Sequence, residues 1–163
     1  MAKESSFDVV SQVDMNEVRN AVNLAQKELR QRYDFKGSVS SVTLDGEALV
    51  LVSDNEGKLR SVVELLQEKL VRRKVPLKAL QYGKSEAALG GTVRQRVAVN
   101  RGISDEKARA ITKLLRQRFK KLKVSVQGDA VRVFSSSKDE LQAVIQTLRD
   151  EDFGIPLQFI NYR

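Results

Sequence analysis

Apolar residues recur at helical spacing in the first half of the chain, and the same pattern returns 82 residues later. Spacings of three and four residues place side chains on one face of an α-helix. The first set is Leu59, Val62, Val63 and Leu66, and the second is Leu141, Val144, Ile145 and Leu148. Each set predicts a helix with one buried face, so the chain reads as an internal repeat.

Alternating apolar and polar residues precede each of these helices, and a glycine beside an aspartate interrupts them. The pairs are Asp45-Gly46 and Gly128-Asp129. Tight hairpin turns need a positive φ, which glycine adopts freely. The pattern predicts strands near 7–11, 38–44, 47–53, 77–82, 94–99, 122–127, 130–135 and 156–162. Helices are expected near 15–33, 56–71, 105–119 and 138–150, with Asp14 and Ser104 as N-caps.

Each half therefore follows the order strand, helix, hairpin, helix, strand, which is the split β-α-β arrangement. The fold class expected is α+β, with two tandem ferredoxin-like domains. Each domain is a four-stranded antiparallel sheet with two helices on one face. We place the domains at 1–91 and 92–163, with "GKSEAALGGTVR" (83–94) as the connector. An exchange of the two first strands between the sheets stays open.

The composition excludes many enzyme mechanisms, because the chain has no histidine and no cysteine. The commonest general base and metal ligand are missing, as are thiolate nucleophiles. We expect no enzymatic activity, no catalytic residues, no metal site and no cofactor. No apolar run approaches the ~20 residues of a membrane-spanning helix. The first residues also lack the apolar core of a signal peptide, so we expect a cytoplasmic protein that does not engage a membrane.

The net charge of +8 is divided unevenly along the sequence. Residues 1–91 carry 14 Lys/Arg against 13 Asp/Glu, whereas residues 92–163 carry 15 against 8. A basic half indicates a phosphate-bearing ligand, since Lys and Arg gain by displacing counterions from phosphates. The alternative is a charged surface that only keeps the protein soluble.

The chain resembles the YajQ family of bacterial nucleotide-binding proteins over its full length. The resemblance is carried by "FDVVSQVDMNEVRNAVNLA" (7–25), "RYDFKGS" (32–38) and the paired octets "VPLKALQY" (75–82) and "IPLQFINY" (155–162). It implies two ferredoxin-like domains similar to RNA-recognition modules. It also implies binding of nucleotides or RNA, with some relatives acting as cyclic di-GMP effectors. It supplies no catalytic residues.

Strand alternation in the second half predicts a basic sheet face opposite the helices. Valines at 97, 99, 124, 126, 131 and 133 point one way. The opposite face is expected to gather four cations and one ring as a nucleotide-binding site: Arg94, Arg96, Lys123, Arg132 and Phe134. Arginine can fork onto phosphate oxygens while Phe134, with Phe159 or Tyr162, stacks on a base. A solvated sheet face is the alternative.

The segment "YDFKG" (33–37) has no counterpart in the second half, where the same interval is four residues shorter. It has two interpretations. Gly37 ends the preceding helix with a left-handed turn while Phe35 packs against that helix. In the other interpretation, Phe35 stacks on a base and Lys36 contacts a phosphate. The sequence "GKS" (83–85) lacks the first glycine of a phosphate-binding loop, so we assign it to the connector.

These features predict a non-enzymatic nucleotide-binding protein that acts as a regulatory effector. Its partners are expected to be a nucleotide (cyclic di-GMP or GTP) or RNA, and a further protein. The alternative is a protein-interaction scaffold without a nucleotide ligand, and a carboxylate-based phosphohydrolase is a third hypothesis. Both a monomer and a homodimer fit. The run "ALVLV" (48–52) is apolar on both faces of its strand, which favours packing against the other domain or another subunit.

Overall fold

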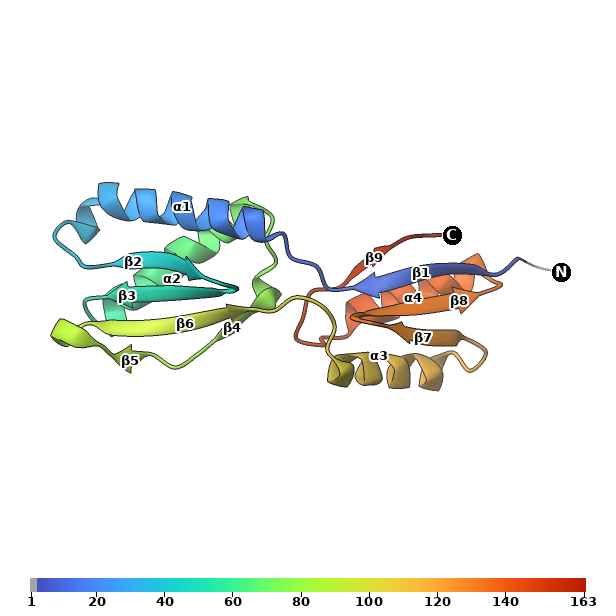
Figure 1. Ribbon diagram of the computed structural model, residues 1–163. Helices are drawn as coiled ribbons and strands as arrows, with labels where there is room; N and C mark the ends of the chain where they lie inside the picture. Colours follow the sequence, from blue (N-terminus) through green and yellow to red (C-terminus); the bar gives the residue numbers. More distant parts are fainter. Residues whose placement is uncertain (1–2) are drawn as a thin grey trace. The chain divides into compact units, whose positions relative to one another are not determined.

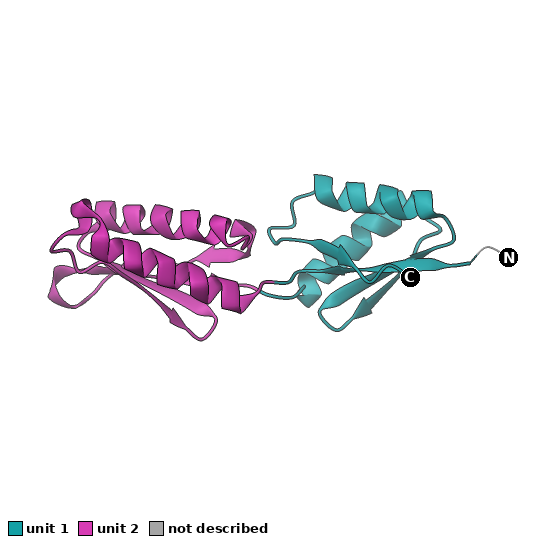
Figure 2. Cartoon of the chain, turned by 90° about the horizontal axis from the view of Figure 1, so that it is seen from above, with its two compact units in different colours: residues 1–12, 101–163 teal, residues 13–100 magenta. Residues whose placement is uncertain are grey.

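The computed structural model describes residues 3–163 and separates the chain into two compact units. Unit 1 comprises the N-terminal residues through Gln12 together with Arg101–Arg163. Unit 2 comprises Val13–Asn100, so it is inserted between two parts of unit 1 (Figure 2). The backbone therefore passes between the units twice.

Unit 2 is an antiparallel sheet with two helices on one face (Figure 1). Its strands, in sheet order, are β2 (Ser41–Asp45), β3 (Ala48–Ser53), β6 (Val93–Val99) and β4 (Leu80–Tyr82). A short strand, β5 (Glu86–Ala87), also pairs with β6. The helices are α1 (Met15–Gln31) and α2 (Glu56–Arg72), and three single turns are η1 (Tyr33–Phe35), η2 (Leu77–Ala79) and η3 (Leu89–Gly91).

Unit 1 repeats this plan with a four-stranded antiparallel sheet. Its strands, in sheet order, are β7 (Lys123–Gln127), β8 (Ala130–Ser135), β1 (Ser5–Val10) and β9 (Gln158–Ile160). The helices are α3 (Asp105–Arg118) and α4 (Lys138–Asp150). Two tandem ferredoxin-like units are thereby confirmed, and the predicted helices and main strands lie close to their expected positions.

The two first strands are exchanged between the sheets. Strand β1 is the first strand of the sequence, but it pairs with β8 and β9. Asp8, for example, lies opposite Arg132, 124 residues later. Strand β6 pairs with β3 and β4 of the other unit. The compact units therefore differ from the linear division at residues 91 and 92, because each half of the sequence supplies one strand to the opposite sheet.

This exchange also redistributes the charge. Unit 1 holds 14 Lys/Arg against 10 Asp/Glu, and unit 2 holds 15 against 11, so each carries a net of +4. The expectation that the positive field belongs to one domain is therefore wrong. The expectation assigned residues 92–163 to one domain. Strand β6 instead places Arg94 and Arg96 in the sheet of unit 2.

Each unit has its own apolar core between sheet and helices. In unit 2, Leu49, Leu51 and Val97 are fully buried beneath α1 and α2. In unit 1, Phe7 and Val133 take the same kind of position. The predicted helix starts are confirmed, because the side chains of Asp14 and Ser104 accept hydrogen bonds from the backbone N–H groups of Asn16 and Lys107. No helix formed by residues 3–163 covers the opposite face of either sheet (Figure 1).

The segment expected to connect the domains instead belongs to unit 2. Strand β5 folds back on β6, with Glu86 opposite Arg94. The N–H of Gly83 donates to the carbonyl of Arg96 at 2.9 Å. A Cβ at position 83 would lie 2.9 Å from that oxygen, so glycine is needed for close backbone approach. The expectation of a connector at 83–94 is therefore wrong.

Candidate nucleotide-binding surfaces

The predicted site residues fall on two different sheets. Arg94 and Arg96 lie on β6 in unit 2, whereas Lys123, Arg132 and Phe134 lie on β7 and β8 in unit 1. The alternation within each strand is as expected, because all five point away from the buried valines of their own strand or its neighbour. The expectation of one shared face is wrong, since β6 does not pair with β7 or β8 among residues 3–163.

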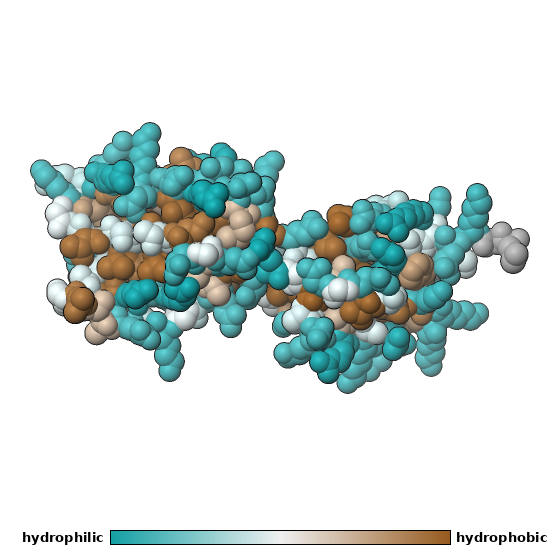
Figure 3. Space-filling view, in the orientation of Figure 1, coloured by the Kyte–Doolittle hydropathy of each residue, from teal (hydrophilic) through white to brown (hydrophobic). Residues whose placement is uncertain are grey.

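On unit 2, Arg96 is engaged by an acidic neighbour. Its Nη1 lies 3.0 Å from Oδ2 of Asp45 on β2. Strand β3 lies between β2 and β6, so this ion pair crosses over Ala48 and Val50, which are nearly buried. Figure 3 shows apolar side chains gathered over these strands. The surface pairs an apolar strip with a partly neutralised arginine, and no aromatic side chain of β2, β3 or β6 joins it.

The loop after α1 follows the structural interpretation of "YDFKG" for Phe35 but not for Gly37. Helix α1 ends at Gln31 with Arg32 as its C-cap, so the expectation that Gly37 ends this helix is wrong. Gly37 has a φ of +77°, and Phe35 is only 4% exposed within the unit 2 core. The guanidinium of Arg32 and the amine of Lys58 lie 5.3 and 5.0 Å from the centroid of the Phe35 ring. A stacking role for Phe35 is therefore contradicted, because a buried ring has no free face. Lys36 is exposed, and its phosphate contact stays a prediction.

On unit 1, three of the predicted residues are brought together on the open sheet face. Lys123 and Phe134 are directly opposite each other on β7 and β8. The Lys123 amine lies 5.2 Å from the centre of the Phe134 ring. Arg132 is two residues from Phe134 on the same side of β8, opposite Ser125. A partly exposed ring, a lysine, an arginine and a hydroxyl thus lie on adjacent strands.

Asp8 organises this face, and the sequence interpretation missed it. Its carboxylate, on β1, accepts hydrogen bonds from Arg132 Nε and from Asn161 Nδ2, each at 2.8 Å. The hydrogen bond from Arg132 holds the pKa of Asp8 below its usual range, helped by Asn161 and by the charge of Arg163. The same pair raises the pKa of Arg132. Arg132 is therefore fixed through Nε, while its two terminal nitrogens stay available for a ligand.

The other aromatic residues expected beside Phe134 lie elsewhere. Phe159 is opposite Val9, so it faces the helices, and Arg149 of α4 lies 5.5 Å from its ring centre. Its ring packs edge-on against Phe7 at 5.8 Å, and Tyr162 also contacts Phe7. Stacking of Phe159 together with Phe134 on one ligand is therefore contradicted. Asn161, with a φ of +59°, interrupts the alternation after β9.

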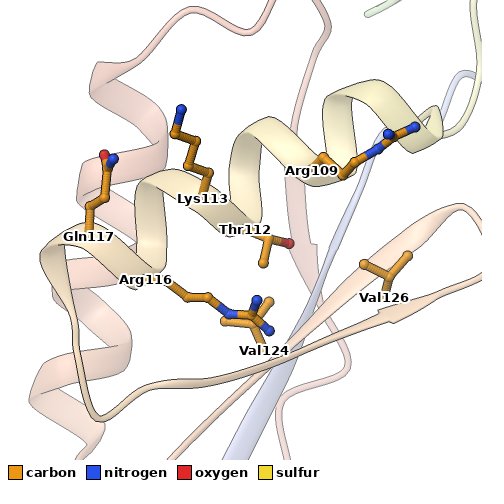
Figure 4. Close-up of a pocket in the computed structure, with 7 residues that line it drawn as sticks. All are labelled: Arg109, Thr112, Lys113, Arg116, Gln117, Val124 and Val126. Carbon is orange, nitrogen blue, oxygen red and sulfur yellow. The ribbon is translucent and has the colours of Figure 1, made fainter.

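A second basic surface lies between α3 and the edge strand β7. It is a groove of about 560 Å³, lined by Arg109, Thr112, Lys113, Arg116, Gln117, Val124 and Val126. In Figure 4, Arg116 and Thr112 point towards β7, whereas Lys113 and Gln117 point away from it at the rim. The signal in the sequence is a run of eight Lys/Arg at 107–123, with no acidic residue from 107 to 128. That segment alone carries +8, the net charge of the whole chain.

No group of three or more acidic side chains is placed to hold a metal ion among residues 3–163. None of the helices within those residues is both long and apolar enough to cross a membrane.

Comparison with known proteins agrees with the fold and the motifs. The family model described as "Nucleotide-binding protein YajQ-like" matches residues 5–163. A nucleotide-binding protein of Desulfitobacterium hafniense (strain DSM 10664 / DCB-2) is 56% identical over 163 residues, covering all of both chains. One of Bacillus cereus (strain B4264) is 53% identical, again over the full length of both. The chain therefore belongs to the YajQ-like family.

Proposed function

We propose that this protein is a non-enzymatic nucleotide-binding protein whose ligand lies on the open sheet face of unit 1. The observation that carries the proposal is the grouping of Phe134, Lys123 and Arg132 on adjacent strands, with Arg132 oriented by Asp8. A base stacks on Phe134, and the phosphate accepts hydrogen bonds from Lys123 and from the terminal nitrogens of Arg132. The family description and the names of the relatives support the same ligand class.

Access to the ring requires Lys123 to move. A cation over an exposed aromatic ring contributes about 0.5–1 kcal/mol, whereas stacking of a base contributes about 1–3 kcal/mol. The exchange is therefore favourable, and it frees the lysine to contact a phosphate. The Asp8–Arg132 pair stays intact in this scheme, because only the outer nitrogens of Arg132 are used.

The side chains on this sheet face favour a compact ligand over base-by-base recognition of RNA. RNA-recognition modules stack bases on two or three aromatic side chains, and here Phe7 is buried, which leaves Phe134 on the central strands. Cyclic di-GMP and GTP each combine guanine with phosphate in a compact molecule and fit this arrangement. RNA held by its phosphates is the alternative ligand. Binding to a further protein would make the molecule a regulatory effector.

Titration calorimetry at low salt with GTP, cyclic di-GMP and a short single-stranded RNA tests the proposal. Phe134→Ala is expected to weaken binding of the preferred ligand roughly 5- to 150-fold, which corresponds to the loss of one stacked base. Val52→Ala is the matched control, because Val52 is the residue of β3 that follows its hairpin turn at the same distance. Equal affinity of Phe134→Ala and wild type would overturn the proposal.

Arginine variants locate the phosphate contact. Arg132→Ala is expected to weaken nucleotide binding, whereas Arg96→Ala is expected to leave it unchanged, because Arg96 lies on the other sheet and pairs with Asp45. A scaffold without a nucleotide ligand remains the second candidate, supported by the apolar strip of unit 2. Salt discriminates the two, since phosphate binding weakens steeply as ionic strength rises and an apolar protein contact does not.

A further inference from the structure

Strand β7 is an unprotected edge of the unit 1 sheet. It pairs with β8 on one side, and none of the residues 3–163 pairs with its other side. A two-residue turn, Gly128-Asp129, closes the hairpin, so the flanking pair Gln127–Ala130 is of the hydrogen-bonded type. Pair types alternate along an antiparallel ladder. Val124 and Val126 therefore direct their N–H and C=O groups outwards, away from β8.

The same two valines form the floor of the α3–β7 groove. Val126 is 48% exposed, which is unusual for a strand residue on the helix side of a sheet. The opposite wall is α3, which supplies Arg109, Lys113 and Arg116. None of these three cations has an ion-pair partner among residues 3–163, although Nε of Arg109 donates to the Asp105 carbonyl at 3.3 Å. The groove thus combines free backbone groups, apolar surface and positive charge.

The dimensions of the two walls match an added strand. Arg109 and Arg116 are seven residues apart on α3, which is about 10.5 Å along a helix at 1.5 Å per residue. Alternate residues of a β-strand are about 6.8 Å apart, so three of them span about 14 Å. Arginine side chains are long and flexible enough to bridge the difference of a few ångströms between these two lengths. Figure 1 shows α3 and β7 running side by side, so an added strand lies along the helix.

We propose that the α3–β7 groove binds an extended acidic peptide segment of a partner protein, which adds to the sheet as a strand beside β7. Its backbone pairs with the outward groups of Val124 and Val126. Alternate acidic side chains face Arg109 and Arg116, and Lys113 adds positive charge at the rim. The methyl-bearing side chain of Thr112 lines the groove between these cations.

A peptide fits the groove better than a nucleic-acid strand. Phosphates accept hydrogen bonds but donate none, so they leave the outward carbonyls of Val124 and Val126 unpaired, whereas a peptide backbone pairs with both kinds of group. Single-stranded nucleic acids also gain much of their affinity from stacking on aromatic rings. The lining residues include no aromatic side chain.

The probe is a fluorescein-labelled nine-residue peptide in which glutamate alternates with threonine, added to the full chain and followed by fluorescence anisotropy. The expected result is saturable binding that Arg109→Gln/Arg116→Gln weakens at least tenfold. A peptide with lysine in place of glutamate is the control and should not bind. Failure of the glutamate peptide to bind, or equal binding of the lysine peptide, overturns the proposal.

Val126→Pro separates strand addition from simple charge attraction. Proline removes the outward N–H of residue 126 but no hydrogen bond to β8, so the fold is expected to persist. Peptide affinity should fall at least tenfold, and wild-type amide exchange at Val124 and Val126 should slow on peptide binding. Unchanged affinity in Val126→Pro together with unchanged exchange overturns strand addition. Competition by a single-stranded RNA of equal charge that equals or exceeds the peptide would identify the groove as a nucleic-acid site and would also overturn it.

Discussion

Asp8 is a buried carboxylate whose hydrogen bonds bear both on the stability of unit 1 and on the proposed ligand site. The residue is 6% exposed and accepts hydrogen bonds from Arg132 and Asn161. Without Asp8, the guanidinium of Arg132 would be free to rotate, and the terminal nitrogens would lose their fixed direction. By contrast, the Arg96–Asp45 pair on unit 2 is more than half exposed on both sides, so solvent screens it.

We predict that Asp8→Asn destabilises unit 1 by about 1–2 kcal/mol at pH 7, the range for a charge-assisted hydrogen bond that is partly screened. Because the folded pKa of Asp8 lies below its unfolded value, the carboxylate stabilises the fold above the unfolded pKa. That contribution is lost as the pH falls through the lowered folded pKa. Urea unfolding at several pH values measures it.

The matched control for this prediction is Asp45→Asn, which removes the exposed pair. It is expected to lose less than half of the free energy of unfolding lost in Asp8→Asn. If the two variants lose the same amount, or if the Asp8→Asn deficit does not shrink in acid, the role assigned to Asp8 is contradicted.

For single residues, strand alternation correctly predicted which side chains lie on the open sheet face. Lys123, Arg132 and Phe134 point as predicted because side-chain direction is a local property of a strand. Asp8 was missed because its partner is 124 residues away and is chosen by sheet pairing. The run of eight Lys/Arg at 107–123 is a local feature of the sequence and is the signal for a basic surface on α3.

The exchange of β1 and β6 has a physical basis in the residues that face each other. The hairpin register makes Val50 and Arg132 equivalent, so Arg96 in unit 2 and Asp8 in unit 1 occupy the same place. With the strands unexchanged, Arg96 would lie opposite Arg132, and like charges directly opposite are destabilising. Gln95 would also replace Phe7 in the core, where Phe7 is fully buried.

A charge-reversal cycle tests this pairing rule. Asp8→Arg should place two cations on opposite positions and destabilise unit 1, and Arg132→Asp should do the same with two anions. The double variant restores opposite charges and should recover at least half of the summed loss. Urea unfolding of the four proteins gives the coupling free energy. Strictly additive losses would show that the pair does not select β1.

The sequence "GKS" (83–85) forms the turn between β4 and β5, where its glycine has a structural role. Gly83→Ala should destabilise unit 2 by about 1–3 kcal/mol, because the added methyl lies 2.9 Å from the Arg96 carbonyl and backbone must move. Lys84 is exposed, so Lys84→Ala should change neither stability nor GTP affinity. Thermal unfolding and calorimetry check both. A loss of GTP affinity in Lys84→Ala would return this segment to consideration as a phosphate loop.

At the scale of the whole molecule, the chain consists of a continuous unit inserted into a discontinuous one. The repeat predicted the order of the helices and main strands, because helix and strand periods are local, although it missed β5. It left open which first strand joins which sheet, since both arrangements satisfy the same hydrophobic pattern. Which first strand joins which sheet depends on cross-strand contacts, such as Phe7 with Val133. These contacts form only when the sheets assemble.

The insertion predicts how the chain can be divided. The fragment 13–100 contains every strand of its sheet and should fold alone, whereas 1–91 lacks β6, which lies between β3 and β4. Cooperative thermal unfolding monitored by circular dichroism should be seen for 13–100 and not for 1–91. A cooperative 1–91 with native-like stability would contradict the exchange.

The roles proposed for Phe134, Lys123 and Arg132 depend on nucleotide binding on the open sheet face of unit 1. Amide and methyl shifts of the isotope-labelled full chain, followed during titration with GTP and with cyclic di-GMP, test it most directly. We expect saturable changes at Lys123, Ser125, Arg132 and Phe134, with none at Arg94 or Arg96. Changes confined to the β6 arginines, or no change on β7 and β8 at saturating ligand, would contradict it.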